Sequence, residues 1–571
     1  MKNQIVADTF YLIADLLDLK GEIFFKSRAY RMAAQTIEAL DEDIEIVAKE
    51  QRLESIPGIG EAIAKKIVEI IETGKLRYVD SLKKEVPEGL IDILRVPGLG
   101  PKKVAALYKN LKITSLSQLR EAAAQGKIRH LEGFGELTEQ NILRGIQLLE
   151  KTSGRALINV AYADGMRYIE YLNHCRHIKH VSLAGSLRRM KETIGDIDIL
   201  ASSKKPKDVM TYFVNYPDVV EILAQGPTKS SVLLHDHIQV DLRVVEQKSY
   251  GAALQYFSGS KEHNVVLRGI ASRKGYKLNE YGLFKKKTDT YVAGKTEQEV
   301  YKKLGFPYFE PELRENHGEF EAATKHTLPV PVGYDEIHGD FHVHSHWSDG
   351  ADSVETLAQT AQHLGYTFLG ITDHSQGLKI ANGLSEDRVL KKMKDIERVN
   401  KKYPEITLLC GTECDIKADG TLDYPDSLLK RFDFVYIAIH TAFKMDKQTM
   451  TRRITKGMQN EHVDFLAHPT GRLIGKREPY EVDIEQVIDT AKETDTFLEI
   501  NSFPDRLDLN DMHAKQVKDH GVKTVIGTDS HSMHHLEYIK FGIATARRGW
   551  QEKKDVLNTY SLKDINNILE R

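Results

Sequence analysis

The chain has 571 residues, of which 41% are hydrophobic and 29% charged, the composition of an ordinary globular protein. This length is too great for one core, so we expect several structural units. The formal charge of −3 excludes attraction of polyanions by overall charge, so nucleic-acid binding would need local basic patches. There is no long apolar run of membrane-span length, and three cysteines form no disulfide framework, so we expect a cytoplasmic protein.

A short glycine motif recurs in the first part of the chain, each time before an amphipathic helical pattern. The glycine pairs are Gly58 and Gly60, Gly98 and Gly100, and Gly133 and Gly135. Such turns let the backbone approach a DNA phosphate, and the N–H groups at the following helix start face the anion. Lys66 and Lys102 add positive charge just inside two of these helices. The repetition favours helix-hairpin-helix motifs over helical turns that merely need glycine.

Three aspartates in the middle of the chain lie on predicted strands. Asp196 and Asp198 are two apart, so they share one face of a strand. Asp241 lies on the polar face of an alternating strand at 237–244. Three carboxylates can hold two magnesium ions about 3.5–4 Å apart, one at a primer 3′-hydroxyl and one at a triphosphate. Asp241 is also a candidate base for the hydroxyl proton.

The stretches GSLRR, GDIDIL, QVDLRVV, YFSGS and LNEYGLF follow the glycine motifs in that order. Together they resemble the family X DNA polymerases, relatives of polymerase beta, over about residues 1–315. The resemblance implies DNA-directed filling of short gaps in base excision repair, with Mg²⁺ or Mn²⁺ held by Asp196, Asp198 and Asp241. It implies nucleotide binding by Gly185, Ser186, Arg189, Tyr256, Phe257, Gly259 and Asn264, and a DNA contact by Arg268.

Some residues depart from the family pattern. Met190 stands where repair members usually have glycine. Lys66 matches the lysine that forms a Schiff base with 5′-deoxyribose phosphate, but Ala62 replaces a second lysine and Phe25 replaces a histidine. Lyase chemistry needs a depressed lysine pKa, which nearby cations assist. We therefore expect Lys66 to bind phosphate and not to act as a lyase nucleophile.

The last part of the chain follows a stretch rich in proline and acids, which reads as a linker. It contains seven short apolar runs, with helical stretches between most of them. Each run leads to metal-capable residues: His342 and His344, Asp373 and His374, Glu413, His440, His468, Asn501, and Asp529 and His531. Polar residues at the C-terminal ends of alternating strands predict a parallel β/α barrel with its active site there.

Six histidines and three acids at these strand ends can fill two or three metal coordination spheres, with Asp349 or Glu413 bridging. Mixed nitrogen and oxygen ligands suit zinc, manganese or iron. The order HVHSHWSDG, ITDH, GTECD, H, AHP, GTDSH resembles the polymerase and histidinol phosphatase (PHP) family. This implies metal binding by His342, His344, Asp349, His374, Glu413, His440, His468, Asp529 and His531. The reaction class is hydrolysis of phosphoesters. Cys410 and Cys414, which flank Glu413, are expected to pack in the core.

We therefore expect a multidomain protein: an all-α helix-hairpin-helix region, an α+β nucleotidyltransferase palm and a distorted (β/α)7 barrel. The expected segments are a helical DNA-binding domain at 1–82, a helical subdomain with two further motifs at 83–150, the palm at 151–248, a nucleotide- and template-binding subdomain at 249–315, a linker at 316–335 and the PHP domain at 336–571.

The leading hypothesis is a gap-filling polymerase whose barrel acts as a 3′-5′ exonuclease or cleans 3′ ends by hydrolysis. The resemblance to the family also implies cleavage at abasic sites by the barrel. Its partners would be dNTPs and gapped or nicked duplex DNA with a 3′ end, bound by a monomer at the nucleoid. One alternative makes the barrel a small-molecule phosphatase or pyrophosphatase. Others are a non-catalytic DNA-end-binding scaffold and a template-independent nucleotidyltransferase.

Overall fold

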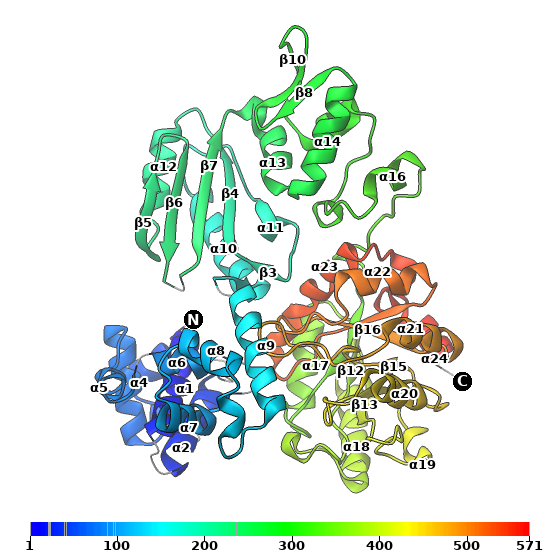
Figure 1. The fold of residues 1–571 in the computed structure, drawn as a ribbon. Coiled ribbons are helices and arrows are strands. Elements are labelled where there is room, and N and C mark those ends of the chain that lie inside the picture. The colour runs from blue at the N-terminus through cyan, green and yellow to red at the C-terminus, as the bar shows by residue number, and fades with distance from the viewer. Residues whose placement is uncertain are drawn as a thin grey trace. The chain divides into compact units, whose positions relative to one another are not determined.

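The computed structural model describes residues 2–20, 24–38, 40, 43–56, 58–87, 89–94, 96, 99–152, 154–235 and 237–569. The chain divides into two compact units, Met1–Ser153 with Gly475–Arg477, and Gly154–Ile474 with Glu478–Arg571 (Figure 1). No helix among the described residues is long and apolar enough to cross a membrane.

Within the described part of residues 2–152, the regular elements are all helices. Its helices are α1 (Lys2–Lys20), α2 (Phe24–Glu38), α3 (Ile44–Lys49), α4 (Glu61–Thr73), α5 (Arg77–Glu85), α6 (Gly89–Leu94), α7 (Pro101–Leu111), α8 (Leu116–Ala124) and α9 (Glu136–Thr152). One hydrophobic core runs from Val6 to Ile146. The expected boundary between residues 82 and 83 falls inside α5, so the two helical segments share a core instead of forming separate domains.

The palm begins the second unit. Its strands are β1 (Ala156–Leu157), β2 (His180–Leu183), β3 (Thr193–Ile194), β4 (Asp196–Ser202), β5 (Val219–Gln225), β6 (Lys229–Leu234) and β7 (Gln239–Val245). Its helices are α10 (Ile158–Asn173), α11 (Gly185–Arg188) and α12 (Pro206–Val214). A five-stranded sheet has the order β2-β4-β7-β6-β5, in which β4 and β7 are parallel neighbours. Apolar residues of alternating strand positions, among them Ile197, Ile199, Val240 and Leu242, build the core against α10 and α12.

The nucleotide subdomain has a core of its own. It contains α13 (Tyr250–Ser258), α14 (Lys261–Arg273), β8 (Tyr276–Asn279), β9 (Gly282–Lys285), β10 (Tyr291–Ala293) and α15 (Glu297–Lys303). The expected linker at 316–335 carries α16 (Glu319–Thr324), and Phe320 and Val332 are buried. It is a packed connection and not a loose tether, because its acids find partners: Glu319 contacts His263.

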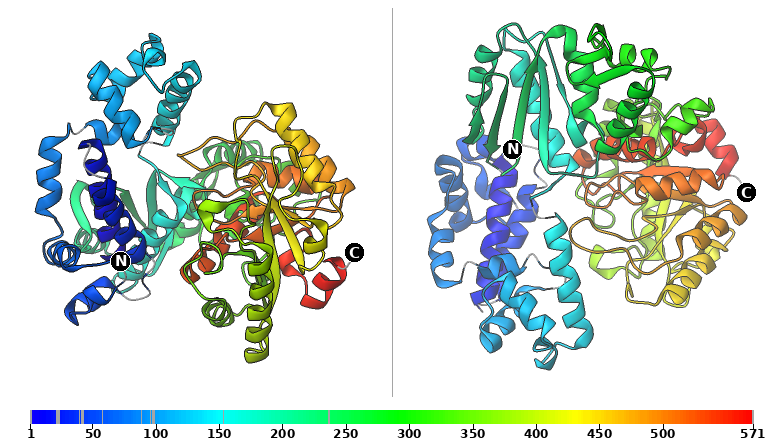
Figure 2. Two further views of the ribbon diagram at one scale, coloured as in Figure 1. Left: turned by 90° about the horizontal axis from the view of Figure 1, so that it is seen from below. Right: turned by 45° about the horizontal axis from the view of Figure 1, so that its top comes forward.

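The barrel forms the rest of the second unit. Its parallel strands are β11 (Gly339–Val343), β12 (Phe368–Ile371), β13 (Thr407–Asp415), β14 (Phe434–Ala438), β15 (Phe465–Leu466), β16 (Phe497–Asn501) and β17 (Thr524–Gly527). The helices are α17 (Val354–His363), α18 (Glu386–Lys402), α19 (Asp426–Leu429), α20 (Lys447–Met458), α21 (Ile484–Glu493), α22 (Asp511–Asp519), α23 (Ile539–Arg548) and α24 (Leu562–Leu569). Figures 1 and 2 show helices around the strands.

The seven strands are hydrogen-bonded in sequence order, and a parallel bridge between Val343 and Ser530 closes the ring. Strands covered on both faces need nearly continuous apolar sequence, which is what the seven runs supply. Phe341, Phe434 and Phe465 are in mutual ring contact in the interior. The predicted β/α barrel is confirmed, and its strand ends carry the metal-capable residues.

Candidate active sites

The three aspartates of the palm lie near the starts of the neighbouring strands β4 and β7, but they are not among the groups of described residues whose ligand atoms all lie within 4.8 Å of one another. The two strands are parallel neighbours, and Asp198 is paired directly with Asp241. Asp196 begins β4, two residues before Asp198. Gly185, at φ 61°, lies against Asp198, and a Cβ at that position would collide with the Asp198 carboxylate. A glycine is therefore needed for the turn into α11 to reach the carboxylates.

The electrostatics of this group favour a bound cation. Burial, together with the charges of Asp196 and Asp241, raises the pKa of Asp198 to about 7. Burial also acts to raise the pKa of Asp241, but hydrogen bonds from Lys229 and other neighbours outweigh it, so this pKa is lowered. Lys229 Nζ lies 2.8 Å from Asp241 Oδ2. Electrostatically coupled carboxylates on neighbouring strands, one of which already attracts an ammonium group, suit a divalent ion.

Arg189 reaches from the palm to the turn after α13. Its Nη1 donates to the carbonyl of Ser258, and its Nε donates to Glu315 Oε1 at 2.9 Å. A Cβ on Gly259 would lie 3.1 Å from Arg189 Nη1. The structure thus places the predicted triphosphate contact beside the predicted sugar pocket. Ser186 lies in α11, in the same turn as Gly185.

The remaining nucleotide-site residues form a connected group on α13 and α14. The Tyr256 and Phe257 rings meet edge to face, with centroids 5.1 Å apart. Asn264 Nδ2 donates to the Tyr256 carbonyl at 2.7 Å, so the Asn264 amide is held against α13. Arg268 is exposed one turn later on α14, and its Nε donates to the Asn264 carbonyl at 3.3 Å.

Sequence reasoning missed the buried ion cluster around Glu297. Arg188 Nη2 lies 2.6 Å from Glu297 Oε2, and Arg314 Nη1 lies 2.6 Å from Glu297 Oε1. Burial acts to raise the pKa of Glu297, but Arg314 and Arg188 lower it to about 2. Adjacent arginines at 188 and 189 therefore differ in role: Arg188 fixes α11 to the nucleotide subdomain, whereas Arg189 lies at the predicted nucleotide site.

We expect Glu297→Gln to destabilise the nucleotide subdomain by about 3 kcal/mol at pH 7, because it leaves the buried Arg314 and the half-buried Arg188 without a carboxylate. The folded pKa of about 2 is below the ordinary 4.5. The stabilisation is therefore complete above about pH 4.5 and is lost as the pH falls towards 2. Hydrogen exchange of the α13–α15 backbone amides measures the loss of stability. Glu262→Gln, an exposed acid on α14, is the control, and equal exchange in the two variants would contradict the expectation.

The predicted DNA-binding turns of the first unit are open on one side. Gly58 has φ 83° and Gly133 has φ 78°, and a Cβ on either would meet nothing within 4 Å. The same open space surrounds Gly60, Gly100 and Gly135. Gly60 and Gly100 precede α4 and α7 as their N-cap residues, without a side-chain cap. Gly98 lies outside the described residues.

Lys66 and Lys102 lie on the helices that follow two of these turns. Lys102 is exposed near the start of α7. Lys66 Nζ donates to the Ala62 carbonyl at 3.1 Å and lies 5.2 Å from the centre of the Tyr78 ring. Its Nζ also lies 6.0 Å from the centre of the Tyr30 ring, and Ala62 supplies no side-chain cation beside it. Phosphate binding by Lys66 stays a prediction.

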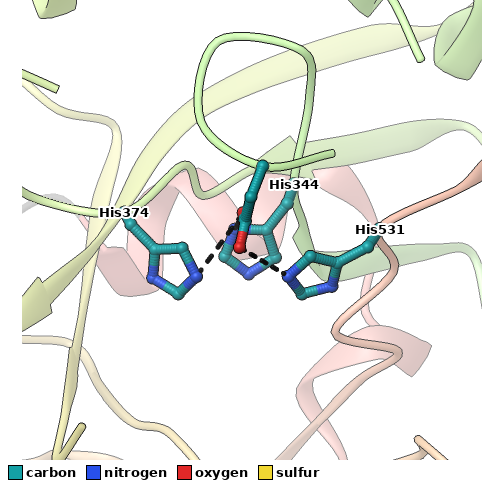
Figure 3. A group of neighbouring side chains, drawn as sticks. His344, His374 and His531 are labelled. Carbon is teal, nitrogen blue, oxygen red and sulfur yellow. Dashed lines mark ion pairs between the residues drawn. The ribbon is translucent and has the colours of Figure 1, made fainter. Parts of the chain in front are cut away.

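The predicted barrel ligands converge at the C-terminal ends of the strands. Three overlapping groups have ligand atoms within 4.8 Å of one another: His344, Asp349, His374 and His531; His342, His344 and Asp529; and His374, Glu413 and His440. Figure 3 shows the rings of His344, His374 and His531 pointing toward one another. His468 joins through Nε2, which lies 2.9 Å from Glu413 Oε1. All nine predicted residues are brought together.

Two acids, Glu499 and Asp415, orient the rings of ligand histidines. Sequence reasoning did not identify them as partners. His342 Nδ1 is 2.6 Å from Glu499 Oε1, so its Nε2 points into the cluster. His440 Nδ1 is 2.5 Å from Asp415 Oδ1, so its Nε2 also points inward. A carboxylate that binds one ring nitrogen of a metal-ligating histidine fixes its tautomer and orientation. A local signal could have found both acids. Asp415 lies two residues after the ligand Glu413 in β13, and Glu499 lies two residues before the polar end of β16, so each shares a strand face with residues at the site.

The donor set fits metal ions. Glu413 Oε2 and His344 Nδ1 are buried, and no hydrogen bond to either is found among the described residues. His342 Nε2 and His344 Nε2 face each other at 3.2 Å. Burial, with neighbouring His374 and His531, lowers the pKa of His344 to about 4. A neutral imidazole is the form that binds a metal.

Two cysteines and one asparagine near the ligands have structural roles. Burial raises the pKa of Cys410 and Cys414 to about 12, and both lie in the core, as expected. Asn501 ends β16. Its Nδ2 donates to Asp529 Oδ2 at 3.1 Å and so orients that ligand.

Family models match four parts of the chain: a helix-hairpin-helix domain at residues 1–76, a SAM-like helix-hairpin-helix tandem at 90–147, the DNA polymerase beta thumb at 253–315 and a PHP domain at 340–503. The DNA polymerase/3′-5′ exonuclease PolX of Bacillus subtilis (strain 168) is 40% identical over 561 residues, which is 98% of each chain. The chain belongs to the PolX family. This confirms the resemblance to family X polymerases with a PHP domain.

Other relatives match separate parts of this PolX family chain. DNA polymerase lambda of Rattus norvegicus is 26% identical over 349 residues, covering 55% of this chain and 56% of the relative. A probable phosphatase of Thermoanaerobacter sp. (strain X514) is 29% identical over 240 residues, covering 40% of this chain and 91% of the relative. The PolX family chain therefore has relatives among polymerases and among phosphatases.

Proposed function

We propose that the chain is a DNA-directed DNA polymerase that fills short gaps in repair, and that its barrel is a metal-dependent 3′-5′ exonuclease. The observation that carries the first part is the pairing of Asp198 with Asp241 across β4 and β7, beside Asp196. The near-full-length likeness to a PolX protein supports both parts. The partners would be dNTPs and gapped or nicked DNA with a 3′ end, bound by a monomer in the cytoplasm, at the nucleoid.

At the palm, Asp196, Asp198 and Asp241 would hold two ions, Mg²⁺ or Mn²⁺. Such ions lower the pKa of a hydroxyl and neutralise charge on a triphosphate. Asp241 would accept the proton of the primer 3′-hydroxyl. Arg189 and Ser186 would contact the triphosphate, where a guanidinium binds phosphate oxygens through paired donors. Gly185 would keep the turn close to the carboxylates.

The other contacts would select and hold the substrates. Tyr256, Phe257 and Gly259 would line the sugar pocket, and Asn264 would touch the edge of the new base. Arg268 would contact the template strand. The turns at Gly58 and Gly60, Gly100, and Gly133 and Gly135, with Lys66 and Lys102, would bind DNA phosphates through backbone N–H groups and positive charge. The open space beside those glycines supports this role.

In the barrel, the predicted ligands would hold two or three ions of zinc, manganese or iron: His342, His344, Asp349, His374, Glu413, His440, His468, Asp529 and His531. Such a cluster supplies hydroxide near neutral pH and binds the oxygens of a phosphoester. The chain's own contribution is orientation: Glu499 and Asp415 each bind one ring nitrogen of a ligand histidine. The same cluster would clean blocked 3′ ends and cleave at abasic sites.

A single assay tests both activities. A gapped duplex with a labelled primer is incubated with Mg²⁺ or Mn²⁺, with and without dNTPs. We expect template-dependent extension when dNTPs are present and 3′ shortening when they are absent, and neither in EDTA. Addition that ignores the template base would support a template-independent transferase, and binding without either reaction would support a scaffold.

A second function for the barrel, hydrolysis of small phosphomonoesters or pyrophosphate, is favoured by the likeness to a probable phosphatase. The full chain is given histidinol phosphate, pyrophosphate or the labelled duplex under the same metal conditions. Cleavage of the small substrates at rates well above that of the 3′ end would favour the phosphatase function. Cleavage of the 3′ end alone would favour the exonuclease.

A further inference from the structure

An arginine of the barrel reaches the predicted nucleotide site of the palm. Arg548, the last residue of α23, is 6% exposed. Its Nη1 donates to Glu315 Oε1 at 2.8 Å and to the Arg189 carbonyl at 3.0 Å. Its Nη2 donates to Asp511 Oδ2 at the start of α22. Residues far apart in the chain thus meet in one compact unit.

Glu315 is shared between two arginines. The same oxygen, Oε1, accepts from Arg189 Nε at 2.9 Å and from Arg548 Nη1 at 2.8 Å. Burial acts to raise the pKa of Glu315, but Arg548, Arg189 and Lys191 lower it. Glu315 is therefore ionised, and its negative charge is divided between the two guanidinium groups.

This sharing matters for the charge that Arg189 offers to a ligand. If Arg189 alone paired with Glu315, the carboxylate would neutralise it. Because Arg548 takes part of that charge, Arg189 keeps positive charge for a phosphate group. Two hydrogen bonds occupy the Nε and one Nη of Arg189. A guanidinium has five N–H donors, so others remain for a ligand.

Arg548 also supports the backbone of the turn. It donates a hydrogen bond to the carbonyl of Arg189. The next residue, Met190, has φ 53°. This left-handed conformation favours glycine, and a larger side chain there needs support from its surroundings. Arg548 thus contacts the backbone of this segment directly, through the Arg189 carbonyl, and the Arg189 side chain indirectly, through Glu315.

We infer that Arg548 and Glu315 are positioning residues for nucleotide incorporation: they fix Arg189 and keep its charge available for the triphosphate. The inference rests on the proposed polymerase function. It means that the barrel contributes to the polymerase site, in addition to any reaction of its own, because the contributing side chain comes from α23. Nucleotide affinity therefore depends on an intact contact between the barrel and the palm.

The test is steady-state incorporation into a gapped duplex by the full chain. We expect Arg548→Met to raise the KM for the incoming nucleotide about 10-fold, with kcat changed much less, because binding charge is lost. Arg547→Met is the matched control. Arg547 is a buried arginine of the same helix that binds Glu312 at 2.8 Å and does not contact Arg189. It should leave KM within about 2-fold of wild type.

A double variant separates charge sharing from simple packing. In Glu315→Gln the carboxylate charge is absent, so adding Arg548→Met should change KM little, and the double variant should have a lower KM than Arg548→Met alone. A purely structural role predicts the opposite, since two losses of buried contacts would add. If Arg548→Met does not fold, Arg548→Lys gives the test: because it keeps the charge, KM should stay within about 2-fold of wild type, and a rise of about 10-fold would overturn charge sharing.

The outcomes are distinguishable. A wild-type chain that incorporates no nucleotide would overturn the proposed function. Wild-type incorporation with the same KM in Arg548→Met and Arg547→Met would overturn only the inference about Arg548. Shortening of the 3′ end in each variant reports whether the barrel is still folded.

Discussion

Asp241→Asn is expected to lower nucleotide incorporation about 1,000-fold or more while binding of gapped DNA persists. The carboxylate is paired with Asp198 across neighbouring strands, and Asn removes one of three negative charges from the predicted ion site. An ion that stabilises transition-state charge contributes several kcal/mol, and each 1.36 kcal/mol is a factor of ten in rate. Primer extension under single-turnover conditions measures the loss.

Glu246→Gln is the matched control for this experiment. It removes an acid close to the same strand, but Glu246 is exposed and pairs with Lys248 at 2.8 Å, away from the aspartates. Its incorporation rate should stay near that of wild type. Loss of gapped-DNA binding in Asp241→Asn would indicate damage to the fold. Retained incorporation would contradict the assignment of the palm site.

The double substitution His342→Ala/His344→Ala is expected to abolish 3′ shortening and to leave template-dependent extension. The two side chains face each other at Nε2 and between them belong to two of the three ligand groups. Their loss removes nitrogen ligands that no neighbouring side chain can replace in the same position. Metal content of the purified protein should fall as well, which gives a readout independent of activity.

His346→Ala serves as the control, because His346 is exposed, lies two residues further along and is outside the three ligand groups. Both reactions should persist in this variant. If the 3′ end is still shortened by the double variant, the barrel is not the nuclease. If extension disappears along with shortening, the two sites depend on each other more strongly than we propose.

Local patterns predicted the elements that carry chemistry. The alternation at 237–244 placed Asp241 and Arg243 on one face of a strand, and β7 buries Val240, Leu242 and Val244 as that pattern requires. The apolar runs that end in histidine or acid predicted the strands of the barrel, and the ligands lie at their C-terminal ends. Side-chain periodicity and strand ends are local properties, so the sequence reports them directly.

The expected linker shows where local patterns mislead. Proline and acids near residue 316 are typical of exposed, loose chain, yet Glu319 is fully buried against His263 and Phe320 packs in the core. The acids around it have partners supplied by distant segments, such as Arg547 for Glu312. Composition shows that a residue is charged, but it does not show whether the fold brings an opposite charge next to it.

Residue types and their strand or helix periodicity can be read along the chain, and they were enough to predict the palm aspartates and the barrel ligands. The partners of these residues became known only from the fold: Asp198 pairs with Asp241, His342 with Glu499, and Arg189 with Arg548 through Glu315. Periodicity can be predicted because it arises from backbone geometry within one segment. Pairing depends on strand register and on the packing of segments that are hundreds of residues apart.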